Sequence, residues 1–570
     1  MAYTVVTIYK KGVGTMFSKI SIPFLCCSLF FIVSAYANPD SVVIPSEQEI
    51  AGIDTTAPNS SAAVITETSP SPVSPPPTAS ESGGTEFNWR RDKARERSAT
   101  VSAEPGKSTT EAAFEPARVN SWETGANKSY LIPALEVPGF LGLLNIYDRI
   151  AYHDQMQDGK KVYSSTFSST WDHLKSQNWV FDKDPFNINQ FAHPYQGATM
   201  YGFARSSGLG FWESLVYSNV GSFMWKMAGE TDPPSINDQI TTGNAGSLLG
   251  EALFRMAGLV LEEGGAKPDI WHEIGAAIVS PPTAANRLVF GDRFKTVFPS
   301  HQPATFWRTQ IGSSFNNSSQ LDATMDFAMS YGLPGKPGYT YTRPLDYFDF
   351  EINGQARASN PVNNVLLRGL LYGSAYHVGN DYRGIWGLYG SYDYLSPAIF
   401  RVSTTALSLG TTGQYWVAPG IALQGSILGG VGFGAAGSTP TAEGDRDYHY
   451  GVAPQGLLAL RLLFGDRASI ELIGRGYYVT GSGQFNSLST SSNAVDSAGG
   501  SETIVRIKTG FNFRVYGRHG LGLQYIESIR DSQYGNQPSR YQRDGTVSLV
   551  YTFMGDSNFG AVEWRDNGNR

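Results

Sequence analysis

An alternation of apolar and polar residues runs through the C-terminal half of the chain and limits its fold more than any other feature. Residues 505–515 have the sequence VRIKTGFNFRV, so one face is mostly apolar and the other carries Arg506, Lys508 and Arg514. Because successive side chains of a β-strand point to opposite faces, this pattern predicts a strand with one apolar and one wet face. Similar stretches recur from about Thr305 to Phe553.

Strands of this kind fit either a soluble sheet packed against another sheet or a barrel whose apolar face meets lipid. Short turns such as residues 465–466 alternate with long polar loops such as 481–501, an asymmetry typical of outer-membrane barrels. No stretch after residue 37 approaches the roughly 18 uninterrupted apolar residues of a spanning helix. We therefore predict an antiparallel transmembrane β-barrel of about 12 strands over residues 305–553, in contact with outer-membrane lipid.

The last predicted strand, residues 546–553, resembles the C-terminal signal by which outer-membrane barrels are recognised for insertion. The resemblance is carried by Gly545, Leu549, Tyr551 and the aromatic Phe553. It implies that the barrel-assembly machinery is a partner during insertion and that the protein resides in the cell outer membrane. A tail, residues 554–570, follows this strand where most such proteins end.

The first 37 residues have the pattern of a secretory signal peptide. A mostly apolar run, residues 20–33, is followed by Ala-Tyr-Ala at residues 35–37, the small residues that a signal peptidase recognises. Cys26 and Cys27, the two cysteines of the chain, lie in this segment. Cleavage would therefore leave a mature protein with no disulfide, thiolate metal site or cysteine nucleophile.

Two further regions separate the signal peptide from the barrel. Residues 38–120 are rich in Ser, Thr and Pro and predict a disordered linker, because they offer too little apolar surface to offset chain entropy. In residues 130–300 the apolar residues recur at helical spacing, most clearly in 195–206, 211–226 and 247–262. The predicted fold class is thus α+β, with a helical block before the barrel.

Composition and charge exclude one class of partner. Charged residues make up 16% of the chain, against about 25% in an average soluble protein, and the net charge is −7. The one short basic stretch, residues 90–97, is interrupted by acids and lies in the predicted linker. A nucleic-acid partner is therefore not expected.

The helical block contains the most distinctive sequence of the chain. Over residues 179–251 it resembles DUF3943, a bacterial family of unknown function, so the resemblance implies no activity. At residues 225–226 the chain has Trp-Lys where the family is expected to have an acid after the tryptophan. The motifs that carry the resemblance are Asp184-Pro185-Phe186, Asn189, His193-Pro194-Tyr195-Gln196-Gly197, Ala204-Arg205, Glu213-Ser214 and Gly250-Glu251.

The ionisable and amide residues of this block have three possible roles. They could form a structural network, bind a ligand or lipid head group, or work as catalytic acid and base. No histidine or carboxylate spacing is typical of a metal site, and we expect no metal and no cofactor. The catalytic candidates are His193, Glu230 and Glu251, and the candidates for a ligand site or polar network are Asn189, Arg205, Glu213, Asn237, Asp238 and Arg255.

We favour the structural network, because buried polar groups must be paired and Glu251 and Arg255 are spaced to pair along one helix. The leading hypothesis is an outer-membrane barrel with a structural or transport-related function and a helical plug or periplasmic domain. One alternative is an enzyme that modifies envelope lipid or glycan through His and Glu residues. Another is a soluble periplasmic β-rich binding protein.

Overall fold

A computed structural model describes residues 127–564 apart from 158–159, 177–178, 182–183, 292–293, 295–296, 298, 318–320, 357–361, 398, 438–447, 482–499 and 535–536. The predicted signal peptide (1–37) and linker (38–120) lie outside the described residues.

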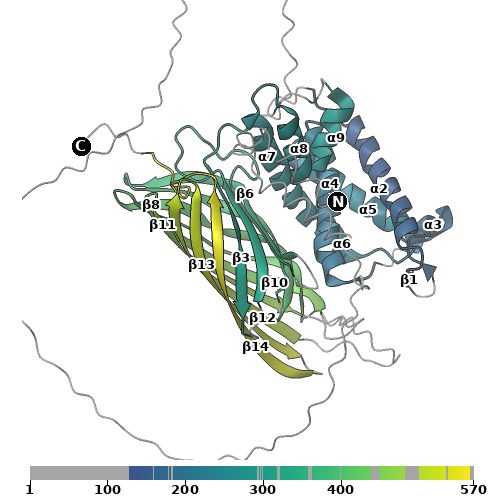
Figure 1. The fold of residues 1–570 in the computed structure, drawn as a ribbon. Coiled ribbons are helices and arrows are strands. Elements are labelled where there is room, and N and C mark those ends of the chain that lie inside the picture. The colour runs from purple at the N-terminus through teal and green to yellow at the C-terminus, as the bar shows by residue number, and fades with distance from the viewer. Residues whose placement is uncertain are drawn as a thin grey trace, which may run out of the picture. The chain divides into compact units, whose positions relative to one another are not determined.

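Twelve antiparallel strands form a closed barrel (Figure 1). Each strand pairs with the next along the chain, and β14 closes the barrel against β3 in a register that sets Val547 opposite Phe315. The prediction of a helical block followed by a barrel of about 12 strands is confirmed. The barrel strands are β3 (Thr305–Asn316), β4 (Leu321–Tyr331), β5 (Phe348–Gln355), β6 (Val362–Val378), β7 (Tyr382–Leu395), β8 (Arg401–Ala418), β9 (Ile421–Gly437), β10 (Tyr448–Phe464), β11 (Ala468–Thr480), β12 (Gly500–Tyr516), β13 (His519–Tyr534) and β14 (Gln537–Met554).

Ion pairs between strands that are not neighbours identify the lumen side of the wall. Lys508 Nζ on β12 lies 3.0 Å from Glu351 Oε1 on β5, and Arg308 Nη1 on β3 lies 2.6 Å from Glu471 Oε1 on β11. These pairs cross the interior, so the polar face of β12 lines the lumen. On the opposite face Phe511 is 45% exposed, as expected for an outward-facing residue of a barrel in lipid.

The residues before the barrel form a block of closely packed helices. Helix α7 is its centre, since residues 246–257 are buried throughout. A Cβ added at Gly246 would lie 2.7 Å from the Cα of Gly197, so the close approach of α4 to the start of α7 requires glycine. The elements are α2 (Leu131–Ala151), β1 (Met156–Gln157), β2 (Lys160–Lys161), α3 (Phe167–Ser176), the π-helix η3 (Ile188–Ala192), α4 (His193–Ser206), α5 (Phe211–Ala228), α6 (Ile236–Ile240), the π-helix η4 (Thr241–Ala245), α7 (Gly246–Glu263), α8 (Ile270–Val279) and α9 (Pro281–Phe290).

Among the described residues, no helix has both the length and the apolar character needed to cross a membrane.

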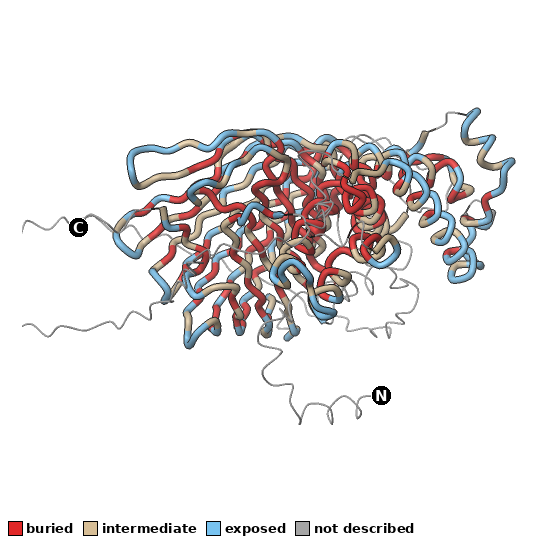
Figure 2. Tube along the Cα trace, turned by 90° about the horizontal axis from the view of Figure 1, so that it is seen from above, coloured by how far each residue is buried: buried red, intermediate tan, exposed pale blue. Residues whose placement is uncertain are grey.

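The helical block packs against the outer face of the barrel wall. Phe350 and Tyr392 alternate along their strands with the lumen-facing residues Glu351 and Asp393, and they share one apolar core with Leu249 of α7. In Figure 2 buried residues continue from the strands into the helices. The described helices therefore do not form a plug, one of the two predicted arrangements, and the other, a periplasmic domain, stays a prediction. The charged side chains on the lumen side of these strands pair with one another. The large apolar side chains lie on the outer face, where the helices cover them.

Candidate functional site

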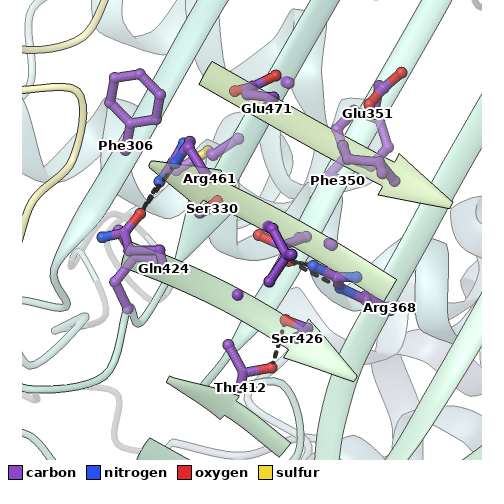
Figure 3. Close-up of a pocket in the computed structure, with 18 of the residues that line it drawn as sticks. Phe306, Ser330, Phe350, Glu351, Arg368, Thr412, Gln424, Ser426, Arg461 and Glu471 are labelled. Atoms are coloured by element: carbon purple, nitrogen blue, oxygen red, sulfur yellow. Dashed lines mark hydrogen bonds and ion pairs between the residues drawn. The ribbon is translucent and has the colours of Figure 1, made fainter. Parts of the chain in front are cut away.

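A cavity of about 120 Å³ lies inside the barrel and is lined by charged residues of both signs (Figure 3). Its lining includes carboxylates from β5 and β11 and arginines from β3, β6, β10 and β11. Because these strands surround the lumen, the cavity is part of the barrel interior. The charged residues of the lining are Arg308, Arg368, Arg461, Arg475, Asp349, Glu351 and Glu471.

Three of the four arginines are paired with carboxylates. Arg308 contacts Glu471, as described above, and Arg368 Nε donates to Asp349 Oδ2 at 2.8 Å. Arg475 Nη1 lies 3.2 Å from Asp393 Oδ2 on β7. Each pair compensates the cost of removing its guanidinium from bulk water.

Arg461 is the exception. Its Nε donates to the neutral amide oxygen of Gln424 at 3.0 Å, and its guanidinium lies 4.7 Å from the centre of the Phe306 ring. Within the described part of the chain, no carboxylate oxygen lies within 4.0 Å of its nitrogens. Figure 3 shows its contact with Gln424 at the cavity. Among the described residues, Arg461 therefore has no carboxylate in ion-pair contact, although Glu471 lies opposite it on β11.

The C-terminal tail folds into the same end of the lumen. The Nε2 of Gln414, a lumen residue of β8, donates to the Val562 carbonyl at 2.7 Å, and its Oε1 accepts from the Val562 amide at 2.9 Å. Gln424 Nε2 donates to the Gly560 carbonyl at 2.8 Å. Phe559 and Val562 are buried in a cluster with the strand residues Phe306, Trp416, Ala422, Leu463 and Met554.

Of the residues predicted from sequence, Arg205, Glu251 and Arg255 come together in the helical block. Glu251 is fully buried between the two guanidinium groups, at 2.7 Å from each Nε, and it also accepts from the Tyr201 hydroxyl at 2.7 Å. The two guanidinium groups compensate the buried carboxylate, which is saturated with donors as a structural network requires.

A second group surrounds Lys226, the residue at which the sequence departs from the expected family pattern. Its Nζ lies 2.5 Å from Asp238 Oδ2 and 2.7 Å from Glu230 Oε2. Trp225 Nε1 donates to the other oxygen of Glu230 at 2.7 Å. The lysine thus supplies the positive charge that two buried carboxylates need.

His193 lies at the edge of this second group. Its Nε2 is 3.6 Å from Asp238 Oδ2, and its Nδ1 is 3.3 Å from Gln196 Oε1. Asn237 Nδ2 donates to Asp238 Oδ1 at 2.8 Å. The structure therefore brings His193, Glu230, Asn237 and Asp238 together around Lys226.

The two remaining predicted residues serve other contacts. Asn189 Nδ2 donates to the hydroxyl oxygens of Tyr448 and Tyr450 on β10, at 3.1 and 3.2 Å, and so connects the helical block to the barrel. Glu213 accepts from the Gly210 amide at 2.7 Å at the start of α5 and from Lys128 at 2.5 Å. None of the nine predicted residues lines the lumen cavity. A catalytic role for His193, Glu230 or Glu251 stays a prediction.

Sequence reasoning did not identify the arginines that line the cavity. Arg308, Arg368, Arg461 and Arg475 lie on four strands far apart in the chain, and no local motif connects them. The available signal was their position on the polar face of amphipathic strands. Among the described residues, no group of three or more His, Cys, Asp or Glu side chains is arranged to hold a metal ion.

Residues 178–282 match the family DUF3943, described as a domain of unknown function, in agreement with the resemblance seen in the sequence. The match includes α4, α5 and α7 with both buried ionic groups and excludes the barrel. No curated protein matches the chain.

Solved structures of porins and channels match the chain at low similarity. The NanC porin is 8% identical, with a TM-score of 0.23, and the alignment covers 43% of this chain and 98% of the porin. The CymD monoaromatic hydrocarbon channel is 9% identical, with a TM-score of 0.19, and 46% of this chain and 90% of the channel are covered. The anion-selective porin from Comamonas acidovorans is 8% identical, with a TM-score of 0.16 and coverage of 44% and 98%.

Proposed function

We propose that the protein is an outer-membrane channel for small anionic solutes and that its own C-terminal tail closes the lumen. Placement in the outer membrane is supported by the apolar outer face of the closed barrel. Large apolar side chains are well exposed on strands around the barrel, including Ile311, Leu409, Phe513, Leu523 and Leu549. Such a belt suits hydrocarbon, and the barrel-assembly machinery is the expected partner for its insertion.

The observation that carries the proposal of an anionic solute is that Arg461, alone among the four arginines of the cavity lining, has no carboxylate in ion-pair contact. Four arginines and three carboxylates line the cavity. Three of the arginines have carboxylate partners, whereas the guanidinium of Arg461 donates to the neutral amide oxygen of Gln424. Because a desolvated cation gains most from an opposite charge, a phosphate or carboxylate group is the solute chemistry that this site favours. The cavity volume of about 120 Å³ leaves room for one small anionic group.

The tail supports a closed resting state. Its backbone is held by Gln414 and Gln424, and Phe559 and Val562 cover lumen residues at the end where β3 begins. Solutes entering from this end would have to displace it. Because a few hydrogen bonds and a small apolar cluster hold the tail, its release from the lumen should need only a moderate free energy, as a gate requires.

The test is the reversal potential of the purified full-length protein in a planar bilayer under a KCl gradient. Open events of the wild type should be anion-selective, and R461Q should reduce the ratio of chloride to potassium permeability severalfold. The matched control is R543Q, which removes an arginine that is 62% exposed and lies on the outer face of β14. Equal selectivity of R461Q and wild type would exclude Arg461 as the selecting charge.

A further inference from the structure

We infer that the helical block is itself embedded in lipid beside the barrel, with the outward faces of α2 and α5 in contact with acyl chains. This inference rests on the part of the proposed function that places the barrel in a membrane, and it assigns a lipid contact to a region outside the barrel. Four observations carry it: the exposed face of α5, the exposed face of α2, the junction with the barrel wall and the buried location of the charges.

Helix α5 exposes a continuous apolar stripe. Trp212, Val216, Val220 and Phe223 are 41–56% exposed, and their spacing of four, four and three residues places them on one side of the helix. The charged residues of α5 are not part of this stripe. Lys226 is buried against carboxylates, and Glu213 is paired at the first turn.

Helix α2 extends the same kind of surface. Its exposed side chains include Leu131, Leu135, Leu143, Ile146 and Ile150. Arg149 is the exposed charge of this helix, and its Nη2 donates to the Ser165 carbonyl at 2.6 Å.

The two helices form one surface that is continuous with the outer wall of the barrel. Val137 and Leu141 of α2 pack with Trp225 of α5 in one buried cluster. At the start of α5, Trp212 stacks on Tyr372 of β6, with ring centres 5.6 Å apart and an angle of 11° between the rings. Tyr372 is 59% exposed on the outer face of the barrel, so the exposed apolar surfaces of the barrel and of α5 meet at this pair.

Around α2 and α5 the charged residues lie inside the block and the apolar residues lie outside, which is the reverse of a water-soluble helix pair. Arg205, Lys226, Glu251 and Arg255 are at most 4% exposed and are paired in the interior, while large apolar residues cover the outside of α2 and α5. Polar residues of membrane-embedded helices face the bundle interior in this way. The close glycine contact between α4 and α7 is also the packing that helices use in lipid. Lipid is thus the occupant that all four observations favour.

The test uses spin labels on single cysteines in a C26S/C27S background, with the full-length protein in phosphatidylcholine vesicles. V216C and V220C report on the stripe. L549C, on the outer face of the barrel, is the lipid reference, because Leu549 is 64% exposed. D154C is the aqueous reference, because the side chain of Asp154 is 83% exposed. Heat-modifiable migration confirms that each variant folds.

The expected result is a ratio of oxygen to nickel-chelate accessibility at V216C and V220C that matches L549C and exceeds D154C severalfold. A ratio equal to that of D154C would overturn the inference, because the stripe would face water. Protection from both reagents would also overturn it, since a second copy or another segment of the chain would then cover the stripe. If L549C itself behaves as aqueous, the placement of the barrel in a membrane fails instead.

Discussion

Arg255 of α7 donates through Nη1 to Asp346 Oδ1 at 3.0 Å, and its Nε contacts Glu251 at 2.7 Å. One guanidinium therefore connects the helical block to the β4–β5 connection of the barrel. Its Nη2 also donates to the Pro344 carbonyl at 2.9 Å, so the connection is fixed by side chain and backbone together. The helical block and the barrel are thus joined by the buried ion pair of Arg255 and Asp346. Removing either residue would leave the charge of the other buried without a partner.

The substitution E251Q should destabilise the helical block by about 3–5 kcal/mol, because it leaves two buried arginines without their shared carboxylate. Circular dichroism at 222 nm during thermal unfolding in detergent measures the loss, while heat-modifiable migration reports separately on the barrel. If E251Q kept wild-type stability but abolished an envelope phenotype, the structural role assigned to Glu251 would be wrong and the catalytic prediction would gain support.

Lys226 and His193 should differ sharply in their effect on stability. K226Q removes the cation that lies between the carboxylates of Asp238 and Glu230. It should lower the free energy of unfolding by about 3 kcal/mol or more. H193Q should lower the free energy of unfolding by less than about 1 kcal/mol, because the nearest polar contacts of the imidazole are long, at 3.3 and 3.6 Å. Thermal unfolding of both variants in the same detergent decides this, and equal losses would contradict the central position given to Lys226.

The barrel could be predicted because its physical requirements are local. Residues 505–515 alternate in sequence, and the structure places Phe511 outside and Lys508 inside as that alternation demands. The predicted helices at 211–226 and 247–262 end within two residues of α5 and α7, because their apolar periodicity is also local.

The position of the helical block could not be predicted in the same way. Tyr392 and Phe350 belong to an outward apolar face whether lipid or a helix covers it, so their pattern does not distinguish the two. The site in the lumen combines Arg308, Arg368 and Arg461, which only the closure of the barrel brings together. The tail is also not periodic, and its place in the lumen depends on Gln414 and Gln424 of distant strands.

The most direct test of the proposed channel compares the full chain with a chain lacking residues 555–570 in a planar bilayer under a KCl gradient. The shortened chain still ends β14 at Met554, so the barrel can close against β3. The account predicts rare openings for the full chain and a steady, anion-selective conductance after removal of the tail. A shortened chain that folds, as shown by heat-modifiable migration, but conducts no ions or prefers cations would contradict it.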